Sequence, residues 1–234
     1  MHHFQRIYRD HADRYDALVA AEDVDGVLLP ALQAVVPLAG ARVVEAGAGT
    51  GRLTRLLAAA GAAHLTATEP AAAMREVATR HLQAEAPPGC AWQVVPGDVR
   101  DLPAPDAAAD LSLAGWVLGH FTEFNPAGWE ADLDQALAEL LRVLRPGGHA
   151  VVIETLGTGA AEPAAPTPAL AALHARMEAA GFRRVVLRTD YLFASVDEAV
   201  AICGFFFGPE LAAALQARGE RRVPEWTGLW HREA

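Results

Sequence analysis

The sequence predicts a doubly wound α/β fold, with a seven-stranded, mostly parallel sheet and helices on both faces. Two observations lead to this prediction. Runs rich in Val, Ile and Leu alternate with segments of helical periodicity over the first two thirds of the chain, which is typical of a buried parallel sheet. A strand, a helical excursion and another strand then end the chain, and they predict an antiparallel C-terminal hairpin at the sheet edge.

Seven runs fit strands. They are "ARVVEAG", "AHLTATE", "AWQVVPG", "ADLSLAG", "HAVVIET", "FRRVVLRTDYLF" and "RRVPEWTGLWH". Leucine and alanine at helical spacing predict helices over 51–60, 70–82, 133–144 and about 168–180. Gly61, Gly181 and the "RPGG" at 145–148 mark helix ends. The segment "SVDEAVAICGFFFGPELAAALQ" is expected to be helical with a break near Gly208 and Pro209.

The composition excludes several classes of protein. With 52% hydrophobic and 21% charged residues it is that of a globular chain, and a formal charge of −10 argues against nucleic-acid or anionic-lipid partners. Cys90 and Cys203 lie far apart without metal-ligand spacing, so we expect neither a disulfide framework nor a metal site. The charged N-terminus, and the lack of an apolar run of about 20 residues, predict a cytoplasmic protein without a membrane partner.

Three glycines follow the first expected strand in "VVEAGAGTGRLT", Val43 to Thr54. In a doubly wound sheet this turn faces the ligand crevice, and glycine permits a close backbone approach that a Cβ would block. A dinucleotide fingerprint needs a small residue where Arg52 stands, and a Walker A loop needs a lysine that this turn lacks. Both observations argue against a phosphate ligand at the turn.

Carboxylates at the ends of two strands indicate a different ligand. Glu45 precedes the glycines, where it would repel a phosphate but could accept hydrogen bonds from an ammonium group. The helix N-terminus near Gly51 favours a negative group, so a zwitterion suits the turn. Glu69 stands 22 residues after Gly47, where it can accept both hydroxyls of a ribose. An amino acid joined to a ribose describes S-adenosylmethionine.

Four motifs in this order resemble those of class I S-adenosylmethionine-dependent methyltransferases, particularly the small-molecule branch. They are "VVEAGAGTG", "TATEPAAAM", "PGDVRDLP" and "LLRVLRPGGHAVVIE", and they cover about residues 40–155. Their order and spacing are much more specific than the glycine turn alone. The resemblance implies a Rossmann-like fold. The chain departs from the family at two positions. The family often has Asp where this chain has Glu45, and Ser where it has Ala71.

The resemblance also implies which residues bind the cofactor. The methionine end would contact Glu45, Gly47, Ala48, Gly49, Thr50 and Gly51, the ribose Glu69 with Pro70, and the adenine Met74, Asp98 and Val99. Ala114, Gly115 and Trp116 would lie near the reactive sulfonium. Tyr15 resembles an N-terminal tyrosine that closes over the cofactor, and its alternative role is to anchor a loose arm.

The transfer itself needs a base only when the acceptor arrives protonated. His120, in "GWVLGHF", is the candidate, because a neutral imidazole can take a proton at cytosolic pH; a purely structural role is the alternative. The expected substrate walls contain Phe121, Trp129, Glu154, Tyr191 and Phe206. These side chains indicate a partly apolar small molecule, although core packing explains the run of phenylalanines equally well.

The chain is therefore expected to be a methyltransferase that moves a methyl group from S-adenosylmethionine to a small molecule by in-line displacement, forming S-adenosylhomocysteine. One alternative is a cofactor-binding protein without methyl transfer, and a less favoured one is an NAD-dependent oxidoreductase. We expect a single domain with an N-terminal arm at 1–30, a cofactor core at 40–155 and a part at 156–234 whose helical excursion near 195–217 faces the substrate. The sequence leaves the acceptor atom and the oligomeric state open.

Overall fold

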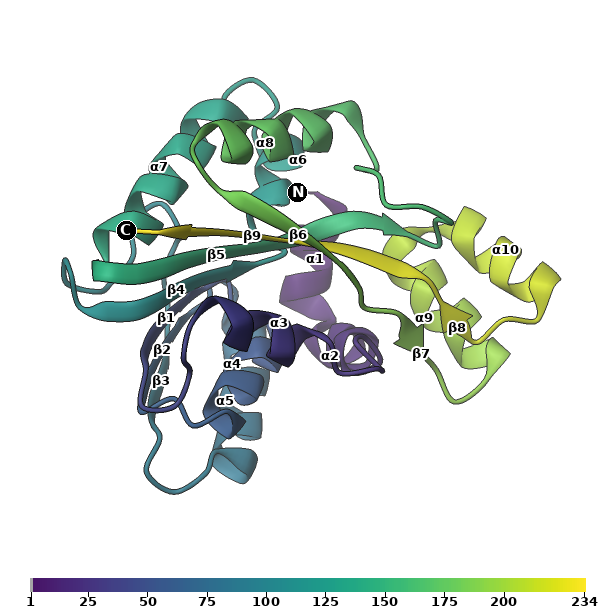
Figure 1. The fold of residues 1–234 in the computed structure, drawn as a ribbon. Helices are drawn as coiled ribbons and strands as arrows, with labels where there is room; N and C mark the ends of the chain where they lie inside the picture. Colours follow the sequence, from purple (N-terminus) through teal and green to yellow (C-terminus); the bar gives the residue numbers. More distant parts are fainter. Residues whose placement is uncertain (1) are drawn as a thin grey trace.

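The predicted doubly wound architecture is confirmed by the computed structural model, which describes residues 2–234 (Figure 1). Seven strands form one sheet in the order β3-β2-β1-β4-β5-β9-β6. In chain order they are β1 (Arg42–Ala46), β2 (His64–Thr68), β3 (Ala91–Val95), β4 (Ala109–Gly115), β5 (Leu144–Thr158), β6 (Arg183–Arg188) and β9 (Glu225–Glu233). The pairs from β3 to β5 are parallel, whereas β9 is antiparallel to both β5 and the edge strand β6.

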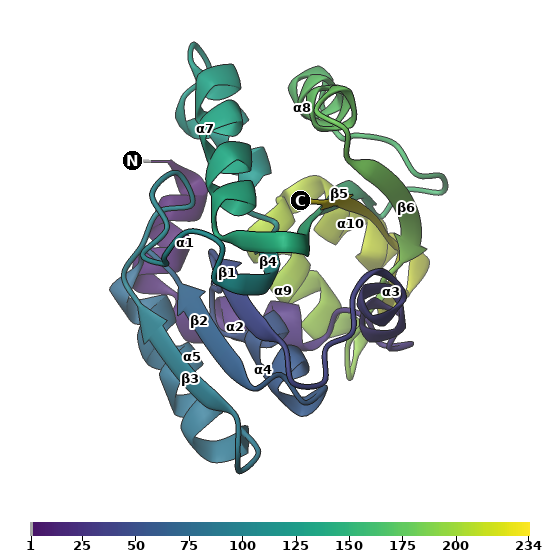
Figure 2. The ribbon, with the colours of Figure 1, turned by 60° about the vertical axis from the view of Figure 1, so that its left-hand side comes forward.

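Helices cover both faces of this sheet (Figure 2). They are α1 (His3–Asp10), α2 (Ala12–Ala20), α3 (Leu28–Val35), α4 (Arg52–Ala59), α5 (Ala72–Glu85), the 3₁₀ turn η1 (Leu118–His120), α6 (Phe121–Phe124), α7 (Trp129–Arg142), α8 (Pro168–Ala179), α9 (Val196–Phe207) and α10 (Pro209–Arg218). Gly208 separates α9 from α10, as the sequence predicts. Within residues 2–234, no helix has the length and apolar character needed to cross a membrane.

Apolar side chains of the strands point alternately to the two faces of the sheet, and a hydrophobic core lies on each face. On one face Val44 and Val152 pack with Leu137 of α7 and other apolar residues of α7 and α8. On the other face Val43 and Ile153 pack with apolar residues of α3 and α4. Because successive side chains of a strand point to opposite faces, each central strand contributes to both cores, and its apolar run is continuous.

One expected strand divides into two. The run "FRRVVLRTDYLF" forms β6 and then β7 (Tyr191–Leu192), which pairs with β8 (Arg222–Val223) in a separate two-stranded sheet. Asp190 lies at the division and is buried; its carboxylate accepts hydrogen bonds from the Glu225 N–H and from Arg222 Nε. These bonds satisfy the buried carboxylate between the two sheets.

The N-terminal arm was expected, but its helices were not assigned from the sequence. α1 and α2 pack against α5, and α2 also contacts α9. Ala12 of the arm is buried with Met74 and Val77 of α5, while Leu18 joins the apolar cluster of α9 and α10. The arm therefore connects the cofactor core to the C-terminal excursion.

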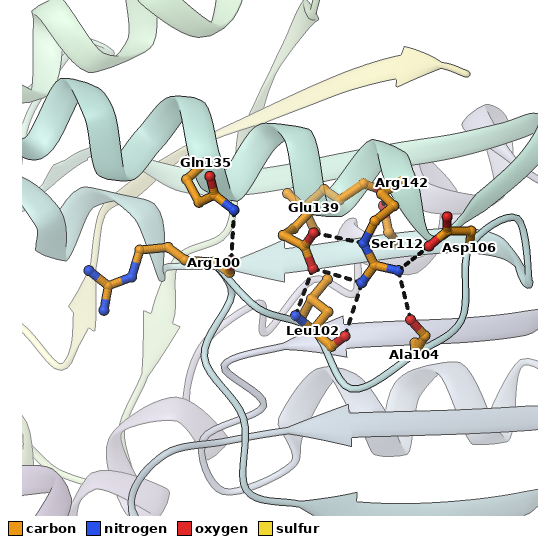
Figure 3. A network of polar contacts seen from close by, with 9 residues as sticks. Arg100, Leu102, Ala104, Asp106, Ser112, Gln135, Glu139 and Arg142 are labelled. Carbon is orange, nitrogen blue, oxygen red and sulfur yellow. Dashed lines mark hydrogen bonds and ion pairs between the residues drawn. The ribbon is translucent and has the colours of Figure 1, made fainter.

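A polar network holds the loop after β3 against α7 (Figure 3). Glu139 accepts a hydrogen bond from the Leu102 N–H at 2.8 Å and pairs with Arg142. Arg142 in turn donates to the carbonyls of Leu102 and Ala104 and to Asp106. The side chains of Glu139 and Arg142 thus supply the hydrogen-bond partners of these backbone groups, which a helix or strand would otherwise provide.

We expect Glu139→Ala to lower the free energy of unfolding by about 1–3 kcal/mol, because the buried Leu102 N–H and Arg142 both lose their acceptor. Denaturant titration measures the change. The control is Gln135→Ala on the same helix, which removes one exposed hydrogen bond to the Arg100 carbonyl and should cost less than about 0.5 kcal/mol. Equal effects of the two substitutions would contradict this role of Glu139.

Candidate functional site

A cavity of about 460 Å³ lies at the carboxyl ends of the central strands. Residues of the glycine turn, β4, β5 and β9 line it from the sheet side, while residues of α1, α2, α9 and α10 cover it. Ligands of doubly wound folds bind at this edge of the sheet. The cavity is therefore the candidate functional site.

The glycine turn brings bare backbone to this cavity. Gly47 has a φ of +65°, and a Cβ there would lie 2.3 Å from Val117 Cγ2, so only glycine fits. Gly49, with a φ of +56°, lies beneath the ring of Tyr15, which would be 3.6 Å from an added Cβ. The arm thus covers the turn through Tyr15.

Two buried carboxylates flank the turn, as the sequence predicts. Glu45 accepts a hydrogen bond from Thr54 Oγ1 at 2.6 Å and lines the cavity. Glu69 accepts the N–H groups of Gly49 at 3.0 Å and Ala71 at 2.8 Å. Glu69 thereby satisfies the N–H of Ala71, the N-cap residue of α5, and fixes the turn to the end of β2.

Three polar atoms in the lining are buried and have no partner within residues 2–234. They are Thr50 Oγ1, Arg52 Nη2 and Glu225 Oε2. Thr50 and Arg52 stand where the turn enters α4, so they present two free donors beside the carboxylate of Glu45. A zwitterionic amino-acid group matches this set, because its carboxylate satisfies the donors and its ammonium satisfies Glu45.

Arg52 and Trp116 join the turn to the end of β4. The Arg52 guanidinium lies 4.5 Å from the centroid of the Trp116 ring and forms an ion pair with the buried carboxylate of Glu22. Trp116 has a φ of +55°, which is rare for a bulky residue, and its N–H donates to the Ile153 carbonyl at 2.7 Å. Such local strain clusters at ligand sites.

His120 lies in the lining and contacts the arm. The Tyr8 hydroxyl and His120 Nε2 are 2.8 Å apart, and the His120 ring stacks on Phe124 with a centroid separation of 5.0 Å. Burial lowers the pKa of His120 to about 4, so the imidazole is neutral at cytosolic pH. It is consequently a weak base held in place by aromatic neighbours.

Glu154, at the carboxyl end of β5, is the second candidate for proton transfer. Its side chain is buried, lines the cavity and accepts the Gly119 N–H at 2.9 Å. Burial raises the pKa of Glu154 to about 7, and the backbone donors around it oppose this rise. Its carboxyl group therefore changes protonation state near cytosolic pH, which His120 does not.

The structure brings most of the expected cofactor residues together. Those in the cavity lining are Tyr15, Glu45, Gly47, Ala48, Gly49, Thr50, Gly115 and Trp116. Four other expected residues are not in the lining. Gly51 and Ala114 are chain neighbours of lining residues, Glu69 is a hydrogen-bond partner of the turn, and Pro70 follows Glu69.

The residues expected near the adenine are placed differently. Met74 is buried against the arm, and Val99 is part of the core on the α7 face. Asp98 forms a two-point ion pair with Arg100, through contacts of 2.9 Å and 2.7 Å, and Arg100 lowers the pKa of its carboxyl. Adenine recognition by these three residues stays a prediction.

The expected substrate walls divide in the same way. Glu154, Tyr191 and Phe206 line the cavity. Phe121 and Trp129 do not; both pack into the core between α7 and the sheet. The helical period of α7 already places Trp129 one turn before the buried Leu133, so packing explains its position.

Several lining residues were not singled out from the sequence, among them Tyr8, Glu22, Thr155 and Glu225. Tyr8 and Glu22 come from the arm, Tyr8 from α1 and Glu22 from the turn after α2, and neither lies in one of the four motifs. Glu225 stands in a strand run beyond the four motifs. Their shared property is burial with a polar group facing the cavity, which depends on tertiary contacts.

Comparison with known proteins identifies the domain. Residues 44–152 match the family model described as a methyltransferase domain. The malonyl-[acyl-carrier protein] O-methyltransferase of Serratia marcescens is 35% identical over 148 residues, which cover 63% of this chain and 50% of that protein. The demethylmenaquinone methyltransferase of Clavibacter sepedonicus is 32% identical over 142 residues, which cover 61% and 52%. The chain thus spans about half the length of these relatives.

Solved structures show the same fold. Phosphoethanolamine N-methyltransferase 2 of Haemonchus contortus has a TM-score of 0.62 at 13% identity, covering 100% of this chain and 60% of that one. The [4+2]-cyclase SpnF has a TM-score of 0.57 at 22% identity, covering 88% and 80%. The matched family model and the curated relatives are those of methyltransferases, in agreement with the resemblance found in the sequence, and the solved structures agree in fold.

Proposed function

We propose that this protein transfers a methyl group from S-adenosylmethionine to a small-molecule acceptor. One observation carries the proposal: a single cavity connects the glycine turn to a space walled by Phe206, Tyr191 and Glu154. A cofactor at the turn and an acceptor in that space would share one enclosed volume. Such enclosure aligns reactants and excludes water.

The residues at the turn fit the cofactor of this family. Glu45 would accept hydrogen bonds from the ammonium group, and Thr50 with Arg52 would donate to the carboxylate. When bound, S-adenosylmethionine supplies a methyl group on a positively charged sulfur, so the protein has little activation to perform. The main tasks of this chain are orientation of the two reactants and removal of a proton where the acceptor carries one.

For that proton we favour Glu154 over His120, which the sequence alone suggested. A general base is most effective when its pKa lies near the working pH. Burial puts the pKa of Glu154 at about 7 and that of His120 at about 4, and both groups line the cavity. His120 would position Tyr8 and the arm through their hydrogen bond.

The size of the cavity and the net charge of −10 support a small molecule rather than a nucleic acid. The names of the relatives, a malonyl-[acyl-carrier protein] O-methyltransferase and a demethylmenaquinone methyltransferase, point to different acceptors. The structural neighbour SpnF is a cyclase, so the fold alone does not decide between methyl transfer and another use of the site.

The test of methyl transfer is a coupled assay for S-adenosylhomocysteine across a panel of small metabolites. We expect turnover with at least one acceptor and saturable binding of S-adenosylmethionine in calorimetry. Binding without turnover on a broad panel would favour the cofactor-binding alternative. Absence of binding, or competition by NAD, would contradict the proposal.

Cofactor binding should depend on pH through Glu45. Burial raises the pKa of Glu45 to about 7, so below pH 7 its carboxyl is largely protonated in the free protein and must lose that proton to hold an ammonium group. We expect the affinity for S-adenosylhomocysteine to fall as pH drops from 8 to about 5.5, by up to about tenfold per pH unit below the pKa of Glu45.

Calorimetry across this pH range measures the affinity. Glu45→Gln should weaken binding at pH 8. It should also lower the slope of the logarithm of the affinity against pH by one, because one proton fewer is lost on binding. Glu123→Gln, which alters an exposed carboxyl elsewhere in the lining, is the matched control and should leave both unchanged. An unaltered slope in Glu45→Gln would show that other groups cause the dependence.

The choice between the two bases is tested by turnover with an acceptor from the panel that loses a proton. Glu154 is ionised above its pKa, so kcat should rise with pH through about 7. Glu154→Gln should reduce kcat by about 100-fold or more, whereas His120→Ala should reduce it less than about tenfold. Melting temperatures of both variants control for folding. A larger loss of kcat in His120→Ala than in Glu154→Gln would indicate that His120 is the base.

A further inference from the structure

Glu225, the first residue of β9, carries a polar atom that neither the fold nor the cofactor accounts for. The residue is 1% exposed and lines the cavity. Its Oε1 accepts a hydrogen bond from Thr155 Oγ1 at 2.8 Å, while Oε2 has no partner within residues 2–234. A buried acceptor without a donor is unfavourable, so this oxygen marks a place for a ligand group.

The strand order separates Glu225 from the turn that would hold the methionine end of the cofactor. β9 lies three strands from β1 in the sheet, which corresponds to roughly 14 Å at the usual strand spacing. The methionine end would be held at the glycine turn by Glu45, Thr50 and Arg52. Glu225 therefore faces the part of the cavity that remains for the acceptor.

The charges of the cavity favour a cation at this place. Six carboxyl groups line it, those of Glu22, Glu45, Glu123, Glu154, Glu210 and Glu225. The sequence contains no lysine, and Arg52 is the one guanidinium in the described lining. Arg52 is paired with Glu22, and His120 is neutral because burial lowers its pKa. A cation here would favour the ionised form of the buried carboxyl groups, whereas an anionic acceptor would oppose their ionisation and find no free positive side chain in the described lining.

The surroundings of Glu225 add to this preference. Its carboxyl has a raised pKa because of burial and because Glu22 lies nearby. The hydroxyl groups of Thr158 and Thr155 and the charge of Arg52 oppose this rise only in part, so a cation beside Glu225 would stabilise the ionised form. The rings of Tyr191 and Phe207 line the same cavity with their centroids 5.9 Å apart. Aromatic faces attract ammonium groups as well as apolar carbon, which suits an amine on a partly apolar skeleton.

We propose that Glu225, together with Glu22, Thr155 and Tyr191, forms a subsite for the protonated amino group of the methyl acceptor. The assignment rests on the proposed function and narrows its substrate class to amine-bearing, partly apolar molecules. A protonated amine has no lone pair, so at this subsite it is a recognition group, and the methyl group goes to another atom of the acceptor.

The experiment compares matched probes of similar size that differ in charge. In the presence of saturating S-adenosylhomocysteine, calorimetry measures the binding of benzylamine and 2-phenylethylamine, of the neutral 2-phenylethanol, and of the anionic 3-phenylpropionate. We expect at least one amine to bind tenfold or more tightly than the alcohol, and the acid to show no binding. Equal affinity for amine and alcohol, binding of the acid, or no binding of either amine overturns the subsite.

Two variants test whether Glu225 causes the preference for amines. Glu225→Gln keeps the shape of the side chain and should weaken amine binding at least tenfold, while the Kd for S-adenosylhomocysteine changes less than twofold. Glu210→Gln removes the same charge from an exposed position in the lining and should change amine binding less than twofold. Equal effects of the two substitutions would overturn the assignment to Glu225. The comparison of probes on the unaltered protein decides the question even where a variant fails to fold.

The outcome is separable from that of the proposed function. Failure to bind S-adenosylhomocysteine contradicts methyl transfer itself. Normal binding of S-adenosylhomocysteine, with methylation of acceptors that carry no amine and no preference for amines, leaves methyl transfer in place and overturns the ammonium subsite alone.

Discussion

The ion pair between Arg52 and Glu22, stacked on Trp116, is the interaction on which the site depends. It connects the arm, the first residue of α4 and the end of β4, three segments far apart in sequence. Both charged groups are largely withdrawn from water, so the pair is favourable only where each group finds its partners. Once formed, it fixes the arm over the glycine turn and encloses the cavity.

Burial raises the pKa of several acidic residues, and the neighbours of each residue determine the role that we propose for it. Desolvation raises the pKa of Glu45, Glu154 and Glu225 alike, but each has different neighbours. Glu45 stands beside the free donors of the turn, Glu154 is held by backbone N–H groups, and Glu225 shares its surroundings with Glu22. One physical effect therefore yields a cofactor ligand, a proton acceptor and a recognition group in our proposals, because position decides what each carboxyl meets.

The cover of the cavity comes from the two ends of the chain. α1 and α2 lie over the turn, and α9 and α10 close the acceptor side, with Leu18 of the arm packed among residues of the excursion. The sheet core between them provides the rigid edge on which the site is built. Families with this fold change their ligand by changing such added segments, since the glycine turn itself is fixed by close packing.

The sequence by itself determined the sheet, most of its helices, and the glycine turn with its two flanking carboxylates. Hydrophobic runs, glycine positions and carboxylates at strand ends are local signals, and they act within a few residues of where they stand. The division of the sixth strand run after Arg188 escaped them, because it depends on Asp190 accepting bonds from Arg222 and Glu225 more than thirty residues away.

Only the tertiary structure decided which of the expected substrate residues line the cavity. His120 and Phe121 were both expected at the site, yet Phe121 packs into the core while His120 lines the cavity, because a 3₁₀ turn and a helix meet there. No local sequence pattern marks Glu225 as a residue of the site. Its significance arises from a strand order that brings β9 beside β5, from burial, and from an oxygen left without a donor. Such properties depend on which segments meet, and no local pattern encodes them.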